Sequence, residues 1–209
     1  MPRRRSQREF NVAYYAANRE REIERVKSRQ AATGKFLREL RNVPCADCGG
    51  TFLPVQLEFD HREPSEKSFT ITAGHALLKS REALLAEVVK CDIVCSNCHR
   101  VRTRRQHRRW LAGRTPSMRG RTPEQRVRWR HHADILDQLR SVPCADCGGR
   151  FPPCSMDFDH RDASTKVRAV SRMINGGYSA MMAEVAKCDI VCANCHHLRT
   201  EARRPKKAA

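Results

Sequence analysis

Acidic residues, aromatic residues and long apolar runs are all scarce in this chain of 209 residues. The 23 Asp and Glu residues stand against 41 Lys and Arg residues, so the formal charge is +18 and a polyanionic partner is expected. Aromatic residues make up 6% of the chain, which argues against a surface that stacks single-stranded bases. No run reaches the roughly 18 to 20 apolar residues of a membrane span, so no membrane partner is expected.

The beginning of the chain also lacks the apolar segment of a signal peptide. Met1 to Arg5 include no apolar segment of the kind found in signal peptides, so we expect a soluble protein that stays in the cytoplasm. In that compartment, cysteines spaced two residues apart indicate metal binding more than disulfides, and the chain has 11 cysteines. A hydrophobic content of 40% with 31% charged residues favours two small domains joined by charged connectors.

The sequence is duplicated. Residues 43–50 (VPCADCGG) recur without change at 142–149, and residues 90–99 (KCDIVCSNCH) recur at 187–196 with one substitution. Between these blocks, Phe59-Asp60-His61-Arg62 returns 99 positions later, from residue 158 to residue 161. The repetition predicts five segments. They are a basic helical arm (1–36), repeat 1 (37–111), an arginine-rich linker (112–135), repeat 2 (136–204) and a basic tail (205–209).

The arm and the linker carry much of the positive charge. Residues 100–130 contain twelve arginines and one acid, Glu124, so their local charge is 12 − 1 = +11. Glycines and prolines break this stretch into a helix, a linker and a second helix. We expect the arm to be helical at least when bound, and the alternative is a solvated tail.

Each repeat supplies two Cys-x2-Cys knuckles. Four thiolates satisfy the tetrahedral preference of Zn²⁺ and leave no open coordination position, which is typical of a structural site. Free thiols, disulfides and an iron–sulfur cluster are the alternatives. Cys91 and Cys188 fall outside the knuckles and are expected in the core, and Cys154 has no counterpart. The eight predicted zinc ligands, four in each repeat, are Cys45, Cys48, Cys95, Cys98, Cys144, Cys147, Cys192 and Cys195.

A repeated Asp-His pair forms the second motif. Residues 57–61 alternate like a strand, whereas His99 directly follows the last cysteine and opens an arginine-rich helical stretch. If zinc ties the knuckles together, Asp60 and His99 can offer an oxygen and a nitrogen to a divalent cation. His61 would then be placed to take a proton from water, as phosphodiester hydrolysis requires.

In this order of motifs the chain resembles the zinc-stapled HNH endonucleases of phages and bacteria, over about 65 residues of each repeat. The resemblance implies an α+β fold of two tandem ββα-metal (HNH, His-Me finger) units. It also implies a catalytic Mg²⁺ or another divalent cation in each unit, with His61 and His160 as general bases. The implied ligands of these cations are Asp60 with His99 and Asp159 with His196.

One departure from that family concerns the asparagine that usually orients the general base. It should fall near Lys90 and Lys187, and neither is asparagine. A backbone carbonyl, or Asp92 and Asp189, could orient the base instead. Asn97 and Asn194 lie inside the knuckles, where an asparagine often closes the turn through its side chain. Lys67 and Lys166 are candidates for phosphate contact, and the alternative is a solubilising role in a loop.

The sequence therefore predicts a metal-dependent DNA endonuclease with two structural zinc ions, acting on duplex DNA in a bacterial or phage-infected cell. Arginine clusters give affinity for phosphates but little sequence information. A monomer acting as a pseudo-dimer would have two active sites and could cut both strands. The alternatives are a catalytically silent zinc-module DNA-binding protein and an RNA-binding zinc protein.

Overall fold

The computed structural model describes residues 6–72, 79–111 and 122–204, and for residues 108–111 the backbone alone. Residues 1–5 of the predicted arm, the middle of the predicted linker and the predicted tail lie outside the described residues. The chain divides into two compact units: structural unit 1 comprises Met1–Val43 and His61–Asp92, and structural unit 2 comprises Pro44–Asp60 and Ile93–Ala209. Structural unit 2 therefore contains all eight knuckle cysteines.

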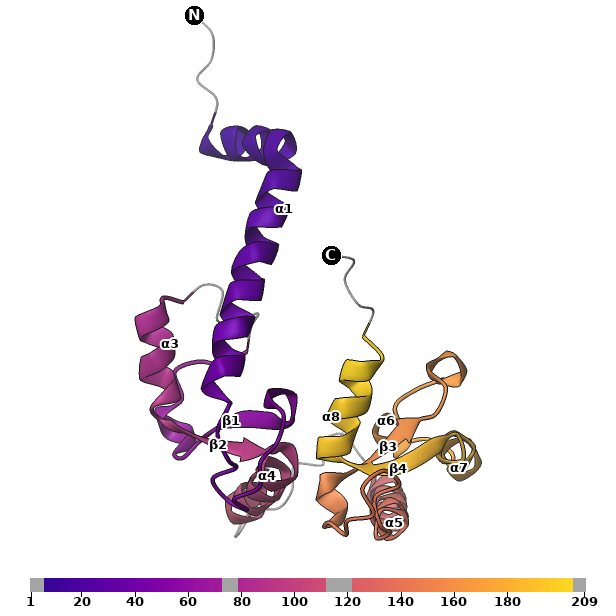
Figure 1. Ribbon diagram of the computed structural model, residues 1–209. Helices are drawn as coiled ribbons and strands as arrows, with labels where there is room; N and C mark the ends of the chain where they lie inside the picture. The colour runs from indigo at the N-terminus through magenta and orange to yellow at the C-terminus, as the bar shows by residue number, and fades with distance from the viewer. Residues whose placement is uncertain (1–5, 73–78, 112–121, 205–209) are drawn as a thin grey trace, which may run out of the picture. The chain divides into compact units, whose positions relative to one another are not determined.

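From residue 7 onward the predicted arm lies in helix α1 (Gln7–Leu40), which continues into repeat 1 (Figure 1). The helix begins with a capping box, in which Ser6 and Glu9 satisfy each other's backbone N–H groups. At Asn18 the backbone leaves helical geometry, and the Asn18 side chain donates to the Tyr14 carbonyl at 2.9 Å. Only Leu37 is buried, so most of this basic helix is exposed to solvent.

Repeat 1 is built around a small sheet. Strand β1 (Leu57–His61) pairs with β2 (Cys91–Cys95), and helix α4 (Ser96–Leu111) follows β2 directly. Helix α3 (Arg81–Val88) precedes β2. Ser80 caps its N-terminus, because the Ser80 hydroxyl accepts a hydrogen bond from the Ala83 N–H. Two short 3-10 turns, Pro54–Gln56 (η1) and Pro64–Glu66 (η2), flank β1.

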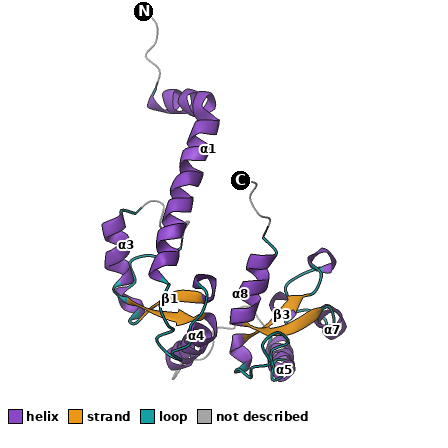
Figure 2. Ribbon diagram, viewed as in Figure 1, coloured by secondary structure: helices purple, strands orange, loops and turns teal. Residues whose placement is uncertain are grey.

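Repeat 2 has a similar order of elements, with one more short helix, α6, between its strands among the described residues (Figure 2). Strand β3 (Met156–His160) pairs antiparallel with β4 (Cys188–Cys192), and Asp159 lies opposite Asp189. Helix α8 (Ala193–Ala202) follows β4, while α6 (Val170–Met173) and α7 (Tyr178–Val185) lie between the strands in sequence. Turns η3 (Pro153–Ser155) and η4 (Ala163–Thr165) flank β3.

Helix α5 (Pro123–Leu139) precedes these elements and spans the boundary expected between linker and repeat 2. Thr122 caps it with Gln125, and proline at its first position needs no hydrogen-bond acceptor there. Its buried Leu136 joins Val170 and Met181 in one small hydrophobic cluster. The fold is thus a mixed α and β structure with two-stranded sheets. No described helix is both long enough and apolar enough to cross a membrane.

The cores are small, as the composition indicates. In repeat 2 one cluster combines Met156 and Val191 with cysteines of the knuckles, and in repeat 1 Leu57 and Val94 do the same. Cys91 is buried, as expected, and Cys188 packs partly buried against the cluster around Leu136. Because sulfur atoms make up so much of these clusters, their packing depends on what holds the sulfurs together.

The two knuckle asparagines bond to each other's backbone within structural unit 2. The Asn97 N–H donates to Asn194 Oδ1 at 3.3 Å, and the Asn194 N–H donates to Asn97 Oδ1 at 3.2 Å. The Ser155 hydroxyl adds a bond to the Asn97 carbonyl at 2.9 Å. Both asparagines are 5% exposed. Their side chains therefore join the knuckles of the two repeats, where the sequence suggested that each closes its own turn.

Replacing Asn97 by Ala should destabilise structural unit 2. The change leaves the buried Asn194 N–H without its acceptor, at a cost of about 1–3 kcal/mol. The urea midpoint of the zinc-loaded protein measures the effect, and the exposed Asn42→Ala is the matched control. Equal midpoints for the two variants would contradict the role of this contact.

Candidate metal centres and nucleic-acid site

The four knuckle cysteines of each repeat come together in space. Their sulfur atoms lie within 4.8 Å of one another in the quartet Cys45, Cys48, Cys95 and Cys98 and in the quartet Cys144, Cys147, Cys192 and Cys195. This confirms the predicted grouping, and each quartet could hold a zinc ion. Tetrahedral coordination by four thiolates would close each site to further ligands.

Local backbone geometry explains why the first knuckle turns so tightly. Gly49 and Gly148 have φ of 69° and 67°, a left-handed conformation that favours glycine. The Gly49 N–H donates to the Cys45 carbonyl at 2.9 Å, which closes the turn. The Cys95 N–H then donates to Cys45 Sγ at 3.1 Å and so links the two knuckles of repeat 1.

These backbone donors also act on the thiol. Burial would raise the pKa of Cys45, but hydrogen bonds from the backbone of Cys48 and Cys95 outweigh it and lower the pKa to about 7. The pKa of Cys144 is lowered to about 7 in the same way. A thiol that ionises near neutral pH is prepared to become a metal ligand, because the thiolate is the binding form.

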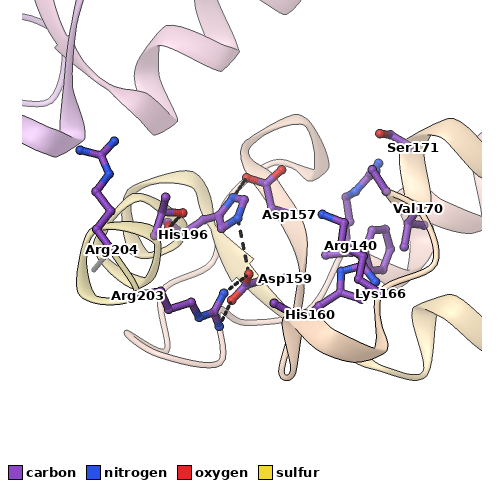
Figure 3. Close-up of a pocket in the computed structure, with 14 residues that line it drawn as sticks. Arg140, Asp157, Asp159, His160, Lys166, Val170, Ser171, His196, Arg203 and Arg204 are labelled. Carbon is purple, nitrogen blue, oxygen red and sulfur yellow. Dashed lines mark hydrogen bonds and ion pairs between the residues drawn. The ribbon is translucent and has the colours of Figure 1, made fainter. Parts of the chain in front are cut away.

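The predicted carboxylate–histidine pairs are also brought together. In repeat 2, His196 Nε2 lies 3.5 Å from Asp159 Oδ1, and His196 Nδ1 lies 2.8 Å from Asp157 Oδ2 (Figure 3). Strand β3 places both aspartates on one face, because alternate residues of a strand point the same way. An imidazole held at one nitrogen by a carboxylate presents its other nitrogen in a fixed direction.

Repeat 1 has the same arrangement, with glutamate in place of one aspartate. His99 Nε2 lies 3.5 Å from Asp60 Oδ1, and His99 Nδ1 lies 2.9 Å from Glu58 Oε2. Hydrogen bonds to Asp60 and Glu58 raise the pKa of His99 to about 9. Burial would raise the pKa of Glu58, but its bond with His99 outweighs this and lowers it to about 2. These acids are therefore ionised at neutral pH.

The histidines expected to act as general bases are each held by a buried glutamate. His160 Nε2 lies 2.7 Å from Glu184 Oε1, and His61 Nε2 lies 2.8 Å from Glu87 Oε1. A hydrogen bond from Lys187 is the main cause that lowers the pKa of Glu184 to about 2. Burial would raise the pKa of Glu87, but bonds from Lys90 and His61 outweigh it and lower the pKa.

The sequence motifs suggested Asp92 and Asp189 as partners of the histidines, and the structure shows the two glutamates instead. Asp92 pairs instead with Arg62 at 3.2 Å, and Asp189 pairs with Arg161 at 3.3 Å and with Arg199 at 2.9 Å. The signal was present in the duplication, because Glu87 and Glu184 recur at the same offset of 97 as the adjoining KCDIVC block. Lys90 and Lys187, where the family has asparagine, each bind the glutamate at 2.7 Å.

A cavity of about 500 Å³ lies over the site of repeat 2. His160, Asp159 and His196 line it on one side, so the candidate base and the candidate metal ligands face one space (Figure 3). Lys166, one of the two lysines considered for phosphate contact, also lines it, whereas Lys67 is an exposed residue of repeat 1. The cavity's basic residues are Arg140, Lys166, Arg203 and Arg204.

The donors fit a hard divalent cation in part. Asp60 and His99 supply one oxygen and one nitrogen, and Mg²⁺ commonly keeps several waters beside one or two protein ligands. Among the described residues, only the cysteine quartets form groups of three or more candidate ligands. A cation at the carboxylate–histidine pair would therefore complete its coordination with water or phosphate oxygens.

Some arginines of the predicted DNA-binding stretch are engaged within the protein. Arg100 makes two bonds to Asp157, at 2.6 and 2.7 Å, and Arg102 Nη1 bonds to Asp60 at 3.2 Å. Other arginines of this stretch face solvent, and phosphate binding can be assigned only to such side chains. The exposed ones in the described part are Arg104, Arg105, Arg126, Arg128 and Arg130.

No family model, curated protein or solved structure matches this chain.

Elemental analysis after dialysis should find two zinc ions per chain. Cys48→Ser should reduce the content to one, because the other quartet is intact, and Cys154→Ser should leave it at two. Removal of zinc by a chelator should abolish the cooperative unfolding of structural unit 2, since metal binding supplies folding free energy in cores of this size. A fully folded protein without metal would contradict this prediction.

Proposed function

We propose that the chain is a metal-dependent endonuclease that hydrolyses phosphodiester bonds of duplex DNA. The observation that carries the proposal is that each repeat has both an aspartate–histidine pair and a buried histidine held by an ionised glutamate. Burying an ionised acid is costly unless it is fully bonded, so the glutamate indicates a role for the histidine that it holds.

Glu184 determines which nitrogen of His160 is basic. An ionised carboxylate only accepts hydrogen bonds, so His160 Nε2 is protonated and its N–H donates a hydrogen bond to Glu184 Oε1. The lone pair then lies on Nδ1, which can take a proton from water. Glu87 acts on His61 in the same way. Such a base contributes about 10²- to 10⁴-fold to the rate of hydrolysis.

The carboxylate–histidine pairs would hold the catalytic cation, Mg²⁺ or another divalent ion. Asp60 with His99, and Asp159 with His196, are the proposed ligands. A bound cation neutralises the phosphate and stabilises the leaving oxygen. This assignment agrees with the resemblance to HNH endonucleases, whose strand–strand–helix order is also the order of β3, β4 and α8. The quartets would hold two structural zinc ions.

The charge of the chain supports DNA as the substrate. Its net +18 and the exposed arginines at 104, 105, 126, 128 and 130 can neutralise phosphates and release counterions. The monomer would act as a pseudo-dimer, because the duplication supplies two related sites within one chain.

One observation favours a second candidate, a catalytically silent zinc-module DNA-binding protein. Asp159 accepts hydrogen bonds from both Arg203 and Arg199, at 2.8 and 3.0 Å. A carboxylate that is already paired with two guanidinium groups has less capacity to bind a metal. Repeat 2 would then retain the fold and the charge without the chemistry.

Incubation of the zinc-loaded protein with supercoiled plasmid and Mg²⁺ or Mn²⁺ should yield cleaved DNA, and omission of the cation should prevent it. The double variant His61→Ala/His160→Ala should be slower by about 10²- to 10⁴-fold, because both bases are lost. The exposed His107→Ala is the control and should cleave at the wild-type rate. Zinc content confirms that each variant is folded. Undiminished cleavage by the folded double variant would contradict the proposal.

DNA binding should weaken steeply with salt. If roughly six phosphates are neutralised, affinity should fall about a thousandfold between 50 and 200 mM salt. Fluorescence anisotropy of a labelled duplex with the His61→Ala/His160→Ala variant measures this without cleavage. Adding Arg104→Gln and Arg105→Gln should lower the slope by about two ions. A flat salt dependence would show that the exposed arginines take no part.

A further inference from the structure

One difference between the two repeats adds a positive charge that directly contacts a candidate metal ligand. After the fourth cysteine the repeats align at an offset of 97, so that His99 corresponds to His196 and Arg102 to Arg199. One turn of helix further on, Gln106 of repeat 1 corresponds to Arg203 of repeat 2. An uncharged side chain in one site is therefore replaced by a permanent cation in the other.

In repeat 2 that arginine, Arg203, binds the carboxylate of Asp159, a candidate metal ligand. Arg203 bonds to Asp159 through both nitrogens, Nη1 to Oδ1 and Nη2 to Oδ2, each at 2.8 Å (Figure 3). Arg199 Nη1 adds a bond to Oδ2 at 3.0 Å, and His196 Nε2 lies 3.5 Å from Oδ1. A carboxylate offers about four lone-pair sites, so these contacts use the capacity of Asp159. Its side chain is 5% exposed.

In repeat 1 the corresponding carboxylate has fewer partners. Among the described residues, Asp60 Oδ2 accepts from Arg102 Nη1 at 3.2 Å, and Asp60 Oδ1 faces His99 Nε2 at 3.5 Å. Gln106 makes no bond to this carboxylate in the described structure. Oδ1 of Asp60 and Nε2 of His99 thus face each other without a guanidinium group across them.

From this difference we infer that the two sites are not equivalent: Asp60 and His99 bind the divalent cation, whereas Arg203 takes the place of a cation at Asp159. This inference rests on the proposed function and specifies which repeat performs it. Arg102 and Arg199 each also pair with a second aspartate, Asp47 and Asp146 respectively. The difference that remains at the carboxylate is the single positive charge of Arg203. One extra charge close to a divalent ion weakens its binding by about tenfold even at the dielectric constant of water, and by more in a partly buried site.

The non-equivalence has a consequence for the reaction. A chain with one cation site breaks one phosphodiester in each encounter, so plasmid would accumulate as nicked circles. Repeat 2 would instead hold the duplex through exposed cations such as Lys166, which lines its cavity and can bind phosphate oxygens.

Electron paramagnetic resonance of Mn²⁺ tests the inference without reference to cleavage. Free Mn²⁺ is titrated against the zinc-loaded full chain, and the bound ion is counted. Wild type should bind one Mn²⁺, and Arg203→Gln, which copies repeat 1, should bind two. Gln106→Arg, which copies repeat 2, should bind none. Arg204→Gln is the matched control, because Arg204 lines the same cavity but pairs with Glu201, and it should bind one.

The outcomes separate the inference from the proposed function. Two bound ions in wild type would overturn the inference and leave the endonuclease proposal standing. One bound ion in both wild type and Arg203→Gln would also overturn it, because Arg203 would not be what excludes the cation. No bound ion in wild type or in Arg203→Gln would overturn both. Asp60→Asn should remove the single ion from wild type, which locates it in repeat 1.

Discussion

The four-sulfur quartet is the constraint on which the rest of each repeat depends. Strand β4 ends at Cys192, helix α8 begins at the next residue, and Cys195 lies within its first turn. Fixing both cysteines against Cys144 and Cys147 therefore fixes the direction in which the helix leaves the strand. His196 follows Cys195 and so is presented to Asp157 and Asp159 on the neighbouring strand. Cores as small as these cannot set such an angle by apolar packing alone.

A second layer of the structure consists of acids that are kept ionised. Glu184 is buried and Asp157 is partly buried, yet each is held charged by cationic or N–H donors, and each in turn holds one histidine. Lys187 and Arg100 provide the compensating charges. Some basic residues of the chain therefore neutralise acids inside the protein, and others lie on its surface. Only the arginines that do not pair with these acids remain to bind DNA.

The sequence allowed prediction of what depends on spacing along the chain. The quartets and the proximity of Asp60 to His99 and of Asp159 to His196 followed from repeated motifs, and the structure brings these residues together. The partners of the candidate bases did not follow. Glu87 lies on a helix 26 residues from His61, and only the fold brings the two together. Side chains that cross between the repeats were equally hard to foresee, as the reciprocal bonds of Asn97 and Asn194 illustrate.

Zinc K-edge absorption spectroscopy tests the central claim that the quartets alone bind zinc and leave the histidines for a second cation. The account predicts four sulfur neighbours for each zinc ion at about 2.3 Å. Three sulfurs and one nitrogen would contradict it, since His99 or His196 would then belong to the zinc site.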